Sequence, residues 1–81
     1  MCSKNDYKVI ITLYEHECTT EMKSFTIKKL HDITDLSVNK IRDTIKSFLL
    51  KGYIAEGAAQ HNAKTYYITQ LGIQKINNLF W

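Results

Sequence analysis

The sequence predicts a single α+β domain, residues 1–81, whose elements follow the order α-(β)-α-α-β-β-α. Apolar residues recur at the three-to-four-residue spacing of amphipathic helices in four segments. Threonine or serine, which are preferred N-caps, precede the last three of these segments. Between the third and fourth segments lie two short runs, the second rich in β-branched and aromatic residues, which together are typical of a hairpin.

The first helix is expected over residues 7–18, with Asp6 as its N-cap. Val9 and Leu13 lie on a second apolar strip, beside the main one. The first and last helices therefore have more apolar surface than one small core needs. Because a chain this short is only marginally stable alone, we expect the surplus to form a homodimer interface. The residues expected there are Val9, Leu13, Leu79, Phe80 and Trp81.

A very short strand at residues 24–25 leads into a second helix, which Thr26 caps and which ends near Ile33. After a tight turn, Ser37 caps a third helix that runs to Lys51, where a glycine follows in the usual stop position. The third helix is amphipathic, and its apolar arc consists of Val38, Ile41, Ile45, Phe48 and Leu49.

The hairpin is expected from strands at residues 53–56 and 64–69, joined by a loop at residues 57–63. Thr69 then caps the last helix, and Gly72 in its first turn is expected to permit close packing.

Two sequence motifs bracket the predicted hairpin. Residues 36–54 begin with leucine and serine, carry aliphatic residues four apart, and end in Lys51-Gly52-Tyr53-Ile54; Tyr67-Ile68-Thr69-Gln70-Leu71-Gly72 follows. Both motifs resemble the winged helix-turn-helix family, in particular the MarR, PadR and ArsR groups. The resemblance covers nearly the whole chain. It implies a winged helix-turn-helix fold and sequence-specific binding of double-stranded DNA, with the third helix in the major groove.

The chain is also similar to the TubR-type adaptors, small winged-helix proteins that bind centromere repeats in plasmid and phage segregation systems. That resemblance implies a filament-forming nucleotidase as a partner. A transcriptional regulator that binds one or two operators is the other role the family implies. A winged helix used only for protein–protein contact is the alternative, favoured by the acidic Asp43 and by a wing without arginine.

The outer arc of the third helix is polar, as a helix in the major groove requires, although a solvated surface helix has the same pattern. Asparagine there suits adenine and Arg42 suits guanine, whereas Asp43 repels phosphate but accepts from a cytosine amino group. Thr44 is also placed on this arc. The candidate DNA contacts of the third helix are Ser37, Asn39, Lys40, Arg42, Asp43, Lys46 and Ser47. In this fold the second helix crosses the phosphate backbone and the wing touches it, which adds Lys23, Thr26, Lys28, Lys29, Gln60, His61, Asn62 and Lys64.

The net charge of +3 is unevenly distributed along the chain. Residues 1–22 carry two basic and four acidic residues, a net −2, and residues 23–81 carry nine basic and four acidic residues, a net +5. A basic body of this kind indicates a polyanionic partner.

No catalytic constellation is visible, because the three histidines fall in different elements and no glycine-rich phosphate loop is present. We therefore expect no enzyme and no cofactor. A metal site built from Cys2, His16 and Cys18 is a weaker alternative to a free, buried Cys18, and no metal is expected. The absence of an apolar run of membrane-spanning length and of a signal peptide predicts a cytoplasmic protein with no membrane contact.

Overall fold

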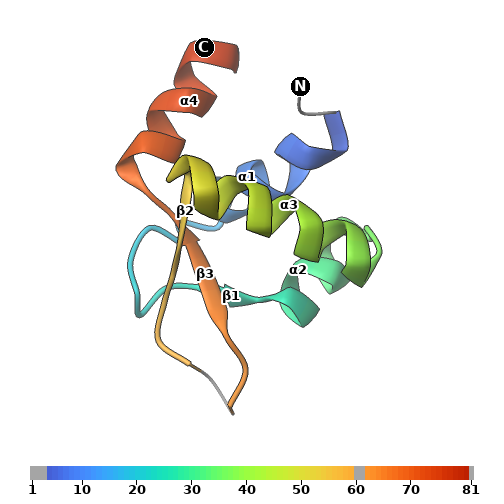
Figure 1. Ribbon diagram of the computed structural model, residues 1–81. Helices are drawn as coiled ribbons and strands as arrows, with labels where there is room; N and C mark the ends of the chain where they lie inside the picture. The colour runs from blue at the N-terminus through green and yellow to red at the C-terminus, as the bar shows by residue number, and fades with distance from the viewer. Residues whose placement is uncertain (1–3, 60–61, 81) are drawn as a thin grey trace.

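A computed structural model describes residues 4–59 and 62–80. The order of helices and strands is the predicted one, and the α+β winged helix-turn-helix fold is confirmed (Figure 1). The elements are α1 (Lys4–Glu15), β1 (Phe25–Thr26), α2 (Ile27–Thr34), α3 (Val38–Lys51), β2 (Ile54–Glu56), β3 (Thr65–Ile68) and α4 (Gln70–Phe80). Among the described residues, no helix combines the length and the apolar character needed to cross a membrane.

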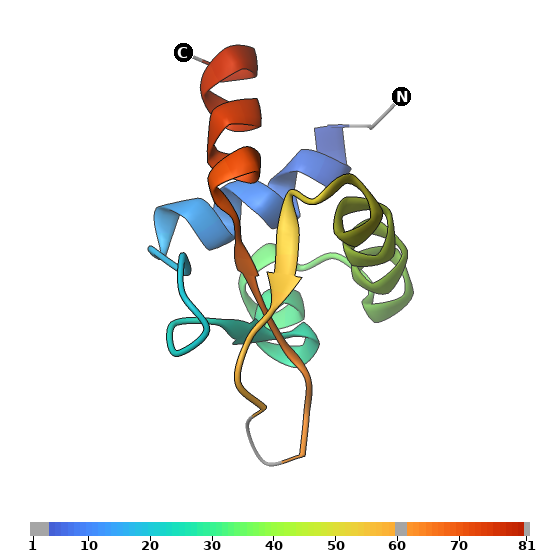
Figure 2. The same cartoon turned by 60° about the vertical axis from the view of Figure 1, so that its left-hand side comes forward.

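The three strands form one antiparallel sheet in the order β1-β3-β2. Tyr66 is the central residue of this sheet, because it pairs with Phe25 on one side and with Glu56 on the other. The β2–β3 hairpin projects from the body of the molecule, and we call residues 54–68 the wing. Figure 2 shows the wing at one end of the molecule and α4 at the opposite end.

Side-chain hydroxyls cap the N-termini of α2, α3 and α4, as the sequence predicted. Thr26 Oγ1 accepts from the Lys29 amide, Ser37 Oγ accepts from the Lys40 amide and Thr69 Oγ1 accepts from the Gly72 amide, each at 3.1 Å. The end of α3 is also as predicted. Gly52 takes a φ of 78°, and its amide donates to the Leu49 and Phe48 carbonyls.

The predicted bounds of α1 were wrong at both ends. The helix begins at Lys4, so Asp6 lies within it and is not its N-cap. It ends at Glu15, because the chain reverses at Glu17, where φ is 58°. Cys18 therefore lies beyond the helix, and its carbonyl accepts from the Ile68 amide at 2.8 Å. This bond ties the segment after α1 to the sheet.

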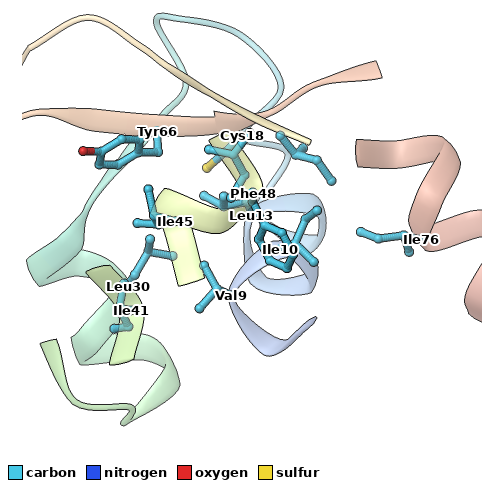
Figure 3. Packing of buried hydrophobic residues seen from close by; sticks show 12 residues of the cluster. Val9, Ile10, Leu13, Cys18, Leu30, Ile41, Ile45, Phe48, Tyr66 and Ile76 are labelled. Atoms are coloured by element: carbon cyan, nitrogen blue, oxygen red, sulfur yellow. The ribbon is translucent and has the colours of Figure 1, made fainter. Parts of the chain in front are cut away.

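The core lies between α1, α3 and the sheet, and Figure 3 shows its side chains converging on Phe48. Val9 and Leu13 are both 0% exposed within it. Their prediction as dimer-interface residues was therefore wrong, because packing inside one chain already uses both faces of α1. The interior cluster consists of Val9, Ile10, Leu13, Cys18, Leu30, Ile41, Ile45, Phe48, Ile54, Tyr66, Ile68 and Ile76.

Two apolar residues near the α2–α3 turn are more exposed than predicted. Ile33 and Val38 are each 38% exposed, whereas Leu30 is fully buried. The turn lies at the edge of the molecule, so the last residue of the α2 stripe and the first of the α3 stripe pass beyond the core.

Candidate nucleic-acid interface

The α2–α3 turn is held by side-chain hydrogen bonds. Thr34 Oγ1 donates to the Leu30 carbonyl at 2.7 Å and accepts from the Leu36 amide at 3.3 Å. His31 Nδ1 lies 2.6 Å from the Leu36 carbonyl, so this nitrogen carries the proton that it donates. Asp35 closes the turn with a φ of 65°. These bonds fix α3 relative to α2, as a helix-turn-helix unit requires.

The core determines which side of α3 faces outward. Ile41, Ile45 and Phe48 are buried, so the opposite arc is turned to solvent. The exposed predicted contacts on α3 and its cap are Ser37, Asn39, Arg42, Asp43 and Lys46, and Lys40 and Ser47 are half-buried beside them.

Thr44 does not belong to this outer arc, and its placement there was wrong. Its side chain is 4% exposed, and its hydroxyl donates to the Lys40 carbonyl at 2.8 Å. A threonine can satisfy its hydroxyl in this way one turn back along a helix, and it then behaves as a small core residue.

Two adjoining hollows run between the start of α2, the side of α3 and the base of the wing. We call them together the basic groove. The first is lined by Thr26, Ile27, Lys28, Arg42, Ala63, Lys64 and Tyr66. The second is lined by Ile27, Arg42, Asp43, Ile45, Lys46, Leu49, Glu56, Lys64 and Tyr66. The groove thus brings together predicted contacts from three separate elements.

Apolar and charged residues line the groove together. Ile27 and Tyr66 line both hollows, and the cations beside them come from α2, α3 and the wing. These cations are Lys28, Arg42, Lys46 and Lys64. Two carboxylates, those of Asp43 and Glu56, also line the groove. Its charge is therefore positive overall but mixed.

Glu56 is a groove residue that sequence reasoning missed. Its Oε1 lies 3.6 Å from Lys64 Nζ, and the two side chains are 51% and 74% exposed. An ion pair this exposed contributes about 0–1 kcal/mol, so Lys64 exchanges partners easily. The hairpin register was the available signal: Glu56 lies opposite Tyr66, two residues from Lys64, which makes Glu56 and Lys64 diagonal cross-strand neighbours.

Other predicted contacts lie outside the basic groove. Lys23 is exposed on the loop after α1, with its Nζ 3.9 Å from Glu17 Oε2, and it lines neither hollow. Lys29 also lies outside the groove, with its Nζ 5.8 Å from the centre of the Phe25 ring. In the wing loop, Asn62 is exposed with a φ of 65°.

Several predictions fall on residues that the structure does not describe. Gln60, His61 and Trp81 are outside the described residues, and so are the side chains of Leu79 and Phe80. Cys2, which was considered for a metal site, is outside them as well.

Cys18 is 1% exposed, as a small core residue. Burial raises the pKa of its thiol, against a smaller lowering by the ammonium of Lys23. The thiol is therefore neutral at physiological pH. Because a metal ion binds the thiolate and not the thiol, Cys18 is a poor metal ligand. Within the described part of the chain, no three His, Cys, Asp or Glu residues gather as a metal site would require.

A helix-turn-helix unit followed by a hairpin that flanks its second helix defines a winged helix-turn-helix protein. No protein-family model matches the chain. The DNA-binding protein TubR of Clostridium botulinum C phage is 48% identical to it over 77 residues, which is 95% of either chain. The chain belongs to the TubR family.

Solved structures agree with this assignment. The solution structure of the DNA-binding TubR fragment from Clostridium botulinum is 46% identical, with a TM-score of 0.79 over 99% of both chains. TubR from Bacillus megaterium has a TM-score of 0.84 at 17% identity, covering 96% of this chain and 86% of its own. At that identity the second likeness supports the fold alone.

Proposed function

We propose that this protein binds double-stranded DNA sequence-specifically, with α3 in the major groove and the wing against the neighbouring backbone. One observation carries the proposal: Lys28, Arg42 and Lys64 belong to three separate elements yet line a single groove. Such convergence of cations around the exposed arc of a helix suits a duplex, whose phosphates flank the bases. The DNA-binding TubR relatives support it.

The candidate contacts fall into two groups, those that suit base edges and those that suit phosphates. On α3, Asn39 and Arg42 project from the exposed arc, and asparagine and arginine suit adenine and guanine edges. Lys28 of α2 and Lys64 of the wing, which both line the groove, suit phosphates. Lys23 has no part in this assignment, because it lies near Glu17 and outside the groove.

The proposal extends to the protein's role. It acts as a homodimer and as a centromere-binding partition adaptor in the cytoplasm, by binding rather than by catalysis, with a filament-forming nucleotidase as partner. Membership of the TubR family supports this role over that of an operator-binding regulator. The two roles differ in the DNA they need: an adaptor binds clustered repeats, whereas a regulator binds one or two operators.

The test is DNA binding by the purified protein across roughly one kilobase around its own gene, at low and at moderate salt. We expect binding confined to one segment and weakened by salt, since displaced counterions drive phosphate contact. Evenly spaced repeats in that segment support the adaptor role, and a single palindrome supports a regulator. No binding at low salt contradicts the proposal and leaves protein–protein contact as the better account.

The groove itself is tested with two variants and a matched control. Arg42→Ala is expected to weaken binding to the recognised segment about 5- to 100-fold, the range for loss of a base contact. Lys64→Ala is expected to weaken binding to all sequences alike and to reduce the salt slope by about one. Lys8→Ala removes the same charge from α1, which contributes no residue to the groove. This control should change neither the affinity for DNA nor the salt slope. Equal losses in all three variants would contradict the assignment.

A further inference from the structure

Asp43 has the opposite charge to the one its position calls for. It is exposed on α3, the helix that we place in the major groove, and it lines the basic groove beside Arg42 and Lys46. A carboxylate there meets the phosphates that flank the groove as a like charge, which weakens binding to any DNA. Because Asp43 lowers the affinity for DNA of any sequence, its presence calls for a specific hydrogen-bond donor on the duplex that compensates for the repulsion.

The fold fixes the direction in which Asp43 points. Ile41, Ile45 and Phe48 lie fully or almost fully buried on the inner side of α3, and Ser37 caps its first turn. The helix is therefore held against rotation. Asn39 is one turn before Asp43 and Lys46 almost one turn after it, and both are exposed. Asp43 thus occupies the middle of the outward arc.

The other acidic residue of the groove has an internal explanation. Glu56 lies on β2 at the wing, and its carboxylate is 3.6 Å from Lys64. Among the described residues Asp43 forms no such ion pair. Both carboxylates line the same groove and carry the same charge, but Asp43 is on α3 without an ion pair in the described part of the chain, whereas Glu56 is on β2 and is paired with Lys64. Removing Glu56 is therefore a control for removing Asp43.

We propose that Asp43 is a specificity-determining residue that accepts a hydrogen bond from the 4-amino group of a cytosine in the major groove. This inference rests on the proposed DNA binding. In the major groove cytosine offers that donor alone, whereas adenine places the N7 acceptor beside its amino group, where it repels a carboxylate. The guanine opposite offers two acceptors, which suit the cation of Lys46 on the same arc. Asp43 lowers affinity for every other sequence by repulsion and recovers it at its own base pair.

The experiment compares Asp43→Ala with Glu56→Ala on three kinds of DNA. These are the recognised segment, a set of variants of that segment in which each base pair is changed in turn (C·G to T·A and A·T to G·C), and a random duplex of equal length. For Asp43→Ala we expect about 5- to 100-fold weaker binding to the recognised segment but tighter binding to the random duplex. One C·G change that weakens the wild type should have no effect on this variant, a coupling that a double-mutant cycle measures.

Glu56→Ala should tighten binding to all three DNAs by a similar factor, because it removes charge without removing a base contact. If Asp43→Ala behaves in the same way, Asp43 acts only by repulsion and the inference is wrong. If the base pair that is coupled to Asp43 is A·T, the amino group belongs to adenine and the cytosine assignment is overturned. A wild type that binds no DNA contradicts the proposed function itself. Unchanged thermal melting of both variants shows that the comparison is between folded proteins.

Discussion

At Gly72 the fold depends on the absence of a side chain. A Cβ at this position would lie 2.3 Å from the Tyr53 carbonyl oxygen and 2.7 Å from Ile68 Cγ1. The same carbonyl accepts from the Thr69 amide at 3.0 Å, so the backbone cannot easily withdraw. Close packing at Gly72, predicted from its place in the first turn of the last helix, is confirmed. Glycine here lets the first turn of α4 pack directly against the backbone of Tyr53, the residue before β2.

Forcing an atom into a packed site usually costs about 1–3 kcal/mol, and the 2.3 Å approach to a backbone oxygen places Gly72→Ala in the upper part of that range. Alanine's better helix propensity recovers about 1 kcal/mol, so we expect a net loss of stability of about 1–2 kcal/mol. Thermal unfolding measures the effect as a loss of several degrees, at roughly 4–8 °C per kcal/mol for a domain this small. Gln74→Ala, an exposed position on the same helix, should leave the melting temperature unchanged. Equal melting of both variants would show that Tyr53 moves aside without cost.

Individual residues were predictable where the cause is local. Thr26, Ser37 and Thr69 cap helices because a hydroxyl reaches an amide three residues on, which is a property of sequence spacing. Val9 and Leu13 were misassigned because periodicity shows that a face is apolar but not what covers it. Glu56 was missed because its partner is set by hairpin register, which depends on the fold.

Among the elements, α3 serves both stability and function. Its buried side packs into the core while its outer arc forms one wall of the basic groove, so its start must be well defined. The Ser37 cap supplies that definition through its bond to the Lys40 amide. The bounds of α3 were predictable for this reason. The bounds of α1 were not: the helix starts three residues before its predicted start and stops three residues before its predicted end, where the backbone reverses at Glu17.

Ser37→Ala is expected to lower stability by about 1 kcal/mol, the typical value of an N-cap. Ser37→Asp should recover it, since a carboxylate also accepts from the amide and favours the helix dipole. Asn39→Ala, two residues further along, removes a polar side chain without touching a cap and should not destabilise, because alanine is the better helix former. Chemical denaturation of the three variants checks this. A loss in Asn39→Ala as large as that in Ser37→Ala would mean that capping is not the cause.

Over the whole molecule, the wing and α4 project from opposite ends of the body (Figures 1 and 2). The sequence predicted the order of elements but not this separation, because the turn at Thr69 determines where α4 points. Ile76 of α4 is buried in the core and Ile73 packs against it, whereas Asn77 and Asn78 further along the helix are exposed. A short helix that leaves the body is marginal in water without a partner. A second copy of the chain, bound at this end, would leave both basic grooves open to DNA.

We therefore expect the protein to sediment as a dimer of its 9.4 kDa chain, and the double variant Phe80→Ala, Trp81→Ala to sediment as a monomer. The variant should also bind a two-site DNA more weakly than the wild type while keeping its single-site affinity, because a dimer presents its second groove at an effective concentration of about a millimolar. Met22→Ala is the control, since Met22 is 82% exposed on the loop after α1 and lines neither hollow of the basic groove. A wild type that remains monomeric at every concentration would show that no dimer forms. A double variant that remains dimeric would show that the interface between copies lies elsewhere.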